Sequence, residues 1–159
     1  MSYSRTARAT LVLAVVAGLT TIPLAANAAS VVSGGSSGRS LSAELLGANE
    51  VGPAGGDPDG SGTANVTVNV GKGELCYSVS FRNIATPLFG HIHDADAGDN
   101  GDVVVTLAAI AGAQGGVAAG CATVDRALLR DIVKDPSGYY VNVHTAEFPA
   151  GAIRGQLGR

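Results

Sequence analysis

The three histidines of this 159-residue chain are the side chains whose type and spacing most directly suggest chemistry. His91 and His93 stand two positions apart in the segment GHIHDADAGDNGD at 90–102, which also holds four aspartates and no lysine or arginine. His144 comes much later in the chain. Neutral imidazole suits zinc, copper and nickel, and three histidines with an open fourth position form a familiar catalytic layout.

Alternating polar and apolar residues predict that these histidines lie on strands. In a strand at 87–93, His91 and His93 point to the same face, because successive side chains alternate between the two faces. In a strand at 138–145, His144 points away from the valines. If the two strands are neighbours, the three imidazoles can converge on one copper or zinc ion.

The histidines also have a structural interpretation. An imidazole can both donate and accept hydrogen bonds, so the rings could bond to backbone groups or to Asp and Asn and hold the loop 94–102. A His-x-His pair on a strand is a weak metal signal by itself. The distance between the ring nitrogens decides between the two interpretations, since ligands of one ion lie within about 3–4 Å of one another.

The acidic turn after the second histidine offers a different candidate, a calcium site. Its carboxylates are Asp94, Asp96, Asp99 and Asp102. Their order lacks the spacing of an EF-hand loop and its closing glutamate. A solvated acidic turn is the simpler interpretation of this segment.

The chain around these residues has the pattern of an all-β domain, in which short alternating segments are split by glycine-rich turns. The expected strands are 40–47, 63–70, 74–81, 87–93, 102–109, 117–124, 138–145 and 151–157. Only the segment at 125–133 has helical spacing, with Asp125 as its N-cap. Seven or eight short antiparallel strands with one short helix indicate a β-sandwich or a small barrel.

The first part of the chain has the layout of a secretory signal. Residues 1–28 combine two arginines, a short apolar run and a final Ala-Asn-Ala, so we expect cleavage after Ala28. The alternative is a membrane anchor, but the apolar run is short for a span. A flexible Gly/Ser-rich leader at 29–39 and one domain at 40–159 would follow. We therefore expect a secreted, extracellular protein with no membrane span in its mature form.

The net charge of the mature chain argues against some classes of binding partner. Residues 29–159 carry 8 basic and 13 acidic side chains, a formal charge of −5. Nucleic-acid binding is disfavoured, because phosphate contacts need clustered lysine and arginine. The chain also lacks a basic amphipathic helix for anionic lipid. The partner that remains is an extracellular protein or a small ligand of unknown identity.

The two cysteines, Cys76 and Cys121, both lie in the exported part. An even number of cysteines in an oxidising compartment predicts a disulfide, which over so long a loop could stabilise the fold by up to about 4 kcal/mol. The alternatives are two buried free thiols or a thiolate metal site. Two thiols 45 positions apart lack the CxxC spacing of such a site.

Three stretches together resemble the signatures of the CHRD domain, a family named after chordin. They are LLGANEVGP at 45–53, GHIHDADAGDNGDVVVTL at 90–107 and YYVNVHTAEFPAGAIRGQL at 139–157. The most specific is the last stretch, which holds Asn142, His144, Pro149, Gly151, Arg154 and Gly155 in order. The resemblance covers about residues 40 to 158.

The resemblance implies an immunoglobulin-like β-sandwich, secretion and, for bacterial members, no established activity. Two features depart from the family. Chordin acts on growth factors and carries cysteine-rich repeats that this chain lacks, so growth-factor antagonism is not carried over. Asp102 stands where the family usually has proline after an Asn-Gly turn.

Glu50 and Arg154 lie in two of the signature stretches. A carboxylate and a guanidinium suit a bidentate ion pair, which would tie the N-terminal loop to the last strand. The alternative is that Glu50 is a metal ligand or a base near the histidines.

These observations favour a secreted, non-enzymatic binding or structural module, because no complete catalytic set is recognisable in the sequence. The alternative is a metal-binding protein or a mononuclear copper or zinc enzyme that uses His91, His93 and His144. A fold alone does not give a function, so the ligand is left unidentified by the sequence.

Overall fold

The eight strands of the computed structural model follow from the alternation of its residues. The structure describes residues 38–159, so the signal segment 1–28 and nearly all of the leader 29–39 lie outside the described residues. The strands are β1 (Arg39–Leu46), β2 (Ser61–Asn69), β3 (Glu74–Arg82), β4 (Phe89–Asp94), β5 (Asp102–Thr106), β6 (Val117–Thr123), β7 (Tyr139–His144) and β8 (Ile153–Gln156). All of the strand pairs are antiparallel.

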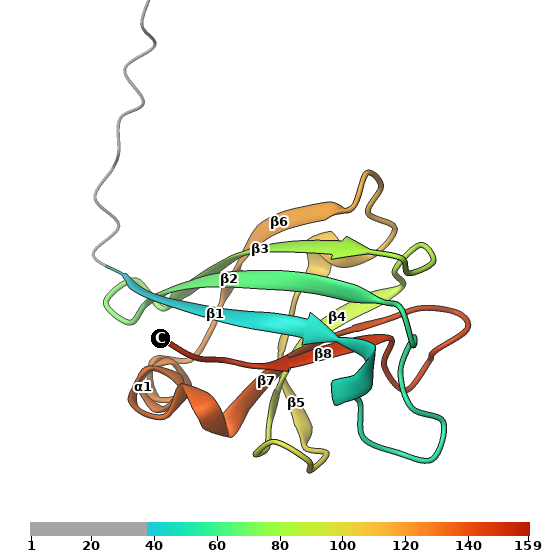
Figure 1. The fold of residues 1–159 in the computed structure, drawn as a ribbon. Coiled ribbons are helices and arrows are strands. Elements are labelled where there is room, and N and C mark those ends of the chain that lie inside the picture. The colour runs from blue at the N-terminus through green and yellow to red at the C-terminus, as the bar shows by residue number, and fades with distance from the viewer. Residues whose placement is uncertain (1–37) are drawn as a thin grey trace, which may run out of the picture. The chain divides into compact units, whose positions relative to one another are not determined.

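The strands form one hydrogen-bonded sheet in the order β5-β4-β7-β8-β1-β2-β3-β6. The sheet curves strongly, so that β1, β2, β3 and β6 face β4, β5, β7 and β8 across the interior (Figure 1). Near the open seam, the backbone N–H of Ala109, just after β5, donates to the Tyr77 hydroxyl on β3 at 2.9 Å. The result is a nearly closed barrel.

The all-β antiparallel class and the single short helix predicted from the sequence are confirmed. The finer immunoglobulin-like sandwich is not confirmed, because such a sandwich has two separate sheets and these eight strands make one. The two halves of the sheet are joined where β1 meets β8, at the pairing of Leu46 with Arg154. Gly155 permits this close approach, because a Cβ there would overlap the backbone carbonyl of Glu44.

The core lies between the two halves of the curved sheet and is built mainly from small aliphatic side chains. Each strand contributes the residues of one face, as on β2, where Ala64, Val66 and Val68 are buried and Asn65 is exposed. Burying such side chains contributes about 25 cal/mol per Å² of apolar surface. This inward and outward alternation fixes which side chains of β4 and β7 share a face.

The helix α1 (Arg126–Lys134) closes one end of the barrel (Figure 1). Asp125 caps it, as predicted, by accepting hydrogen bonds from the backbone N–H groups of Ala127 at 2.7 Å and Leu128 at 3.3 Å. Leu129 and Ile132 are buried against the core. These contacts explain why α1 forms where the helical spacing of the sequence predicts it.

Cys76 and Cys121 form a disulfide, as predicted. The two residues are direct partners in the pairing of β3 with β6, so the bond joins the edge strand β6 to its neighbour. A bond across 45 residues limits the unfolded chain and contributes about 2–4 kcal/mol to stability.

Candidate metal centre

The pairing of β4 with β7 brings the three histidines onto one face of the sheet. The strands are neighbours, as the sequence analysis expected, and their register places Phe89 opposite His144, His91 opposite Asn142 and His93 opposite Tyr140. Because side chains alternate along each strand, all six residues of these pairs project from the same face.

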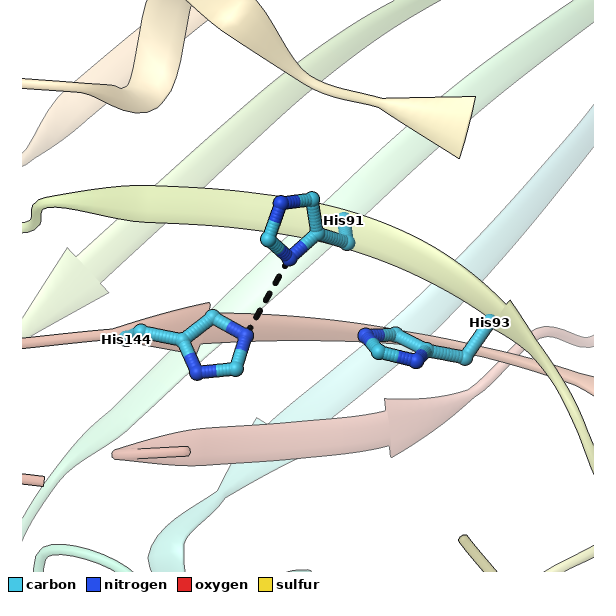
Figure 2. Close-up of side chains that lie close together, drawn as sticks. All are labelled: His91, His93 and His144. Atoms are coloured by element: carbon cyan, nitrogen blue, oxygen red, sulfur yellow. Dashed lines mark hydrogen bonds between the residues drawn. The ribbon is translucent and has the colours of Figure 1, made fainter. Parts of the chain in front are cut away.

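The histidine rings come close together on this face (Figure 2). His91 Nδ1 and His144 Nε2 are 3.2 Å apart. One ring nitrogen from each of His91, His93 and His144 lies within 4.8 Å of the other two. The first distance matches two ligands that each bond one ion at 2.0–2.1 Å, whereas the third ring must move slightly closer to share that ion.

Backbone carbonyls hold the outer nitrogens of two rings. His93 Nδ1 donates to the Gly101 carbonyl at 2.9 Å, and His144 Nδ1 donates to the Pro149 carbonyl at 3.1 Å. Since a carbonyl can only accept, both rings carry their proton on Nδ1, and Nε2 of each neutral ring carries a lone pair. In His144 this lone pair accepts a hydrogen bond from His91 Nδ1. Metal-ligating histidines typically donate their second nitrogen in this way, which fixes the tautomer and the ring orientation.

The electrostatic environment keeps the cluster in its neutral form. Burial, together with the neighbouring His144 and His93, lowers the pKa of His91 to about 4. Burial also lowers the pKa of His144, although its hydrogen bond to Pro149 acts in the opposite direction. Both rings are therefore neutral at physiological pH, as metal ligation requires.

Arg154 is completely buried, with 1 % of its surface exposed, and holds the acidic turn in place. Its guanidinium donates to the carbonyls of Asp96 at 3.2 Å and Asp99 at 2.6 Å, and to the Asn100 side chain at 3.2 Å. The turn therefore directs backbone oxygens inward. Its carboxylates belong to no group of three potential ligands within residues 38–159, so the calcium interpretation has no support in this part of the chain.

Arg154 also reaches the histidines through an aromatic ring. Its guanidinium lies 3.4 Å from the centre of the Tyr140 ring. His93 stacks on the same Tyr140 ring, with the two ring centroids 4.7 Å apart and the two ring planes inclined by 4°. A guanidinium over an aromatic face is stabilising, and the stack fixes the plane of His93.

The direct ion pair of Glu50 with Arg154 is not formed. The two residues line the same cleft of about 380 Å³, but the guanidinium donates to the acidic turn instead, and Glu50 Oε1 is buried without a hydrogen-bond partner. The carbonyls of Asp96 and Asp99 and the side chain of Asn100 supply acceptors for the guanidinium without Glu50, which explains the difference from the prediction.

The Glu50 side chain packs closely against the loop that follows β7. A Cβ at Gly151 would overlap its carboxylate. Burial raises the pKa of Glu50 to about 7, and the charge of Arg154 and a hydrogen bond from Asn142 oppose that rise. Glu50 therefore lies close to Asn142, and it belongs to no potential metal-ligand group with the histidines in residues 38–159.

Asn142 is the site residue that sequence reasoning missed. It is 2 % exposed, and its Oδ1 lies 3.1 Å from His93 Nε2. The only sequence signal was its place in the third signature stretch, on the same strand face as His144.

A second potential ligand group, Glu74 with the two cysteines, offers no thiolates, because Cys76 and Cys121 are bonded to each other.

The comparison with protein families matches the CHRD domain over residues 41–157. The chain belongs to the CHRD domain family. This match contains the three histidines, Asn142, Glu50 and Arg154. No curated protein and no solved structure matches the chain. Across residues 38–159 of this CHRD domain protein, no helix has both the length and the apolar character needed to cross a membrane.

We predict that Arg154→Ala lowers the free energy of unfolding by about 2–4 kcal/mol, because it leaves buried carbonyls of the turn unpaired. Urea unfolding measures this change. Arg130→Ala, at an exposed position on α1, is the matched control and should change stability by less than about 0.5 kcal/mol. A loss of less than about 1 kcal/mol for Arg154→Ala would contradict this role.

Glu50 should make stability fall as pH rises. Its pKa is about 7 in the folded state and near 4.5 when unfolded, so between these values the folded state binds more protons. Relative to the wild type, Glu50→Gln should be more stable by about 1–3 kcal/mol at pH 8 and equal at pH 4.5. Urea unfolding with a chelator present measures the difference, and a pH-independent difference would refute the raised pKa.

Proposed function

We propose that this CHRD domain protein is a secreted binding module whose ligand is a single copper or zinc ion, held by His91, His93 and His144. The observation that carries the proposal is the arrangement of ring nitrogens. One pair is 3.2 Å apart, all three lie within 4.8 Å, and two rings have their outer nitrogens bonded to carbonyls. A purely structural cluster would not need one nitrogen from each of three rings to lie this close together.

The ligand atoms determine the kind of ion. Three neutral imidazoles suit zinc and copper, whereas calcium and magnesium prefer oxygen ligands. Copper binds more tightly than zinc to a given nitrogen site, so the supply of metal decides which ion is bound. Burial of His93 and His144 strengthens the site further, because it excludes competing water.

Secretion is part of the proposal and has two supports. Residues 1–28 have the composition of a signal segment, and the domain contains a disulfide between neighbouring strands. Disulfides persist in oxidising compartments outside the cytosol. An extracellular site is also where a metal-binding protein meets ions that are not buffered by the cell interior.

A mononuclear metalloenzyme is the second candidate. His91 is partly exposed, so solvent or a small substrate could reach an ion on that side of the cluster. A catalytic ion needs such an open position, whereas a structural ion has four protein ligands. Turnover of a redox or hydrolytic substrate by the copper- or zinc-loaded protein, abolished by His144→Ala, would favour the enzyme over the binding module.

Isothermal titration of untagged protein with Zn²⁺ or Cu²⁺ should give one site per chain. His93→Ala and His144→Ala should each weaken binding at least about 100-fold, because each removes a ligand. Asp99→Asn, on the acidic turn, is the matched control and should bind as the wild type does. Unchanged binding in both histidine variants would refute the three-histidine site even if an ion bound elsewhere.

Acid should weaken metal binding only at a pH well below the ordinary pKa of imidazole. The pKa of His91 is about 4 and that of His144 is lowered, so protons compete with the metal for these two rings only below the ordinary imidazole range. We expect the loss of affinity to become steep as pH approaches 4 in the same titration. Complete loss of binding by pH 6 would contradict the lowered pKa values.

A further inference from the structure

Asn142 lies at the centre of the histidine face. It stands on β7 two positions before His144, directly opposite His91 on β4. It is 2 % exposed, so its amide needs partners within the protein. Its Oδ1 is 3.1 Å from His93 Nε2, a distance close to the 3.2 Å between His91 Nδ1 and His144 Nε2.

The contact between Asn142 and His93 joins two acceptors. His93 donates its Nδ1 proton to the Gly101 carbonyl, so Nε2 of the neutral ring carries a lone pair. An amide oxygen also carries only lone pairs. Two such atoms do not hydrogen-bond to each other, but a cation placed beside both of them satisfies both.

Glu50 lies next to the Asn142 amide, whose oxygen faces His93. In its ionised form the Glu50 carboxylate can only accept hydrogen bonds, so it favours the orientation with Nδ2 toward Glu50 and Oδ1 toward the histidines. The Glu50 side chain packs closely on Gly56, where an added Cβ would meet its Cγ at 2.7 Å.

We propose that Asn142 Oδ1 is the fourth ligand of the metal, which makes the site one of three nitrogens and one oxygen. This proposal rests on the proposed function, since it adds a ligand to the same site. Two ligand atoms that each bond an ion at 2.0–2.2 Å are separated by about 3.1–3.3 Å when the angle between them is near tetrahedral. The Asn142–His93 and His91–His144 distances both agree with that separation.

A fourth protein ligand changes the kind of site. Four protein ligands around zinc are typical of structural sites, whereas catalytic zinc keeps a position for water or substrate. With Asn142 bound, the ion holds β4 and β7 together and presents no position for a substrate. The site then favours the binding module over the mononuclear enzyme.

The test uses the exported chain and Co²⁺ as the probe ion, because the visible spectrum of Co²⁺ reports the number and type of its ligands. Asn142→Ala should weaken Co²⁺ and Zn²⁺ binding at least about 10-fold and change the Co²⁺ spectrum. Asn142→Asp, which keeps an oxygen at the same place, should bind one ion at least as tightly as the wild type. Asn65→Ala, at an exposed position on β2, is the matched control and should leave both unchanged.

Two results would overturn the fourth ligand and leave the histidine site standing. The first is Asn142→Ala binding within twofold of the wild type with the same spectrum, and the second is Asn142→Asp losing affinity as Asn142→Ala does. If Asn142→Ala does not fold, two other measurements test the fourth ligand. One is the affinity of Asn142→Asp, and the other is the ¹⁵N resonance of the wild-type Asn142 side-chain amide, which must shift when Zn²⁺ binds. A wild type that binds no ion would instead refute the proposed function.

Discussion

The burial of the Arg154 guanidinium is the interaction on which the candidate site depends. A buried charge is costly unless its donors are all paired, and here the carbonyls of Asp96 and Asp99 and the side chain of Asn100 provide the acceptors. The turn is folded around this charge. Gly101 lies at its end, and the carbonyl of this residue fixes the tautomer of His93.

The Arg154 guanidinium also influences His93 through the ring of Tyr140. The ring of Tyr140 is stacked between the guanidinium and His93, and its hydroxyl accepts a hydrogen bond from the backbone of Gly101 at 3.4 Å. Two contacts therefore fix the position and orientation of His93. One is the hydrogen bond to the Gly101 carbonyl of the turn, and the other is the stacking on the Tyr140 ring. A ligand held in this way needs little reorganisation when an ion binds.

The strand segments and the direction of their side chains could be predicted from sequence. Alternation placed His91 and His93 on one face, and the same rule placed His144 on the polar face of its strand. The cap at Asp125 and the disulfide of Cys76 with Cys121 were also predicted, because both depend on local composition or on a simple count.

The strand order and the partners of buried polar groups were beyond sequence reasoning. Pairing of β1 with β8 depends on closure of the whole sheet, and no local pattern reports it. Arg154 was expected to meet Glu50, but its partners are the Asn100 side chain and two backbone carbonyls, and the carbonyls have no residue-type signal. Asn142 was overlooked for a related reason, since its importance comes from the three-dimensional neighbourhood of His93 and Glu50.

X-ray absorption fine structure of the zinc-loaded protein tests the central claim most directly, because it reports the atoms around the ion itself. The account predicts four nitrogen or oxygen neighbours at about 2.0–2.1 Å, with the outer-shell scattering of three imidazole rings. A shell of oxygen atoms without imidazole scattering would contradict it, because the ion would then be bound by carboxylates elsewhere on this acidic protein.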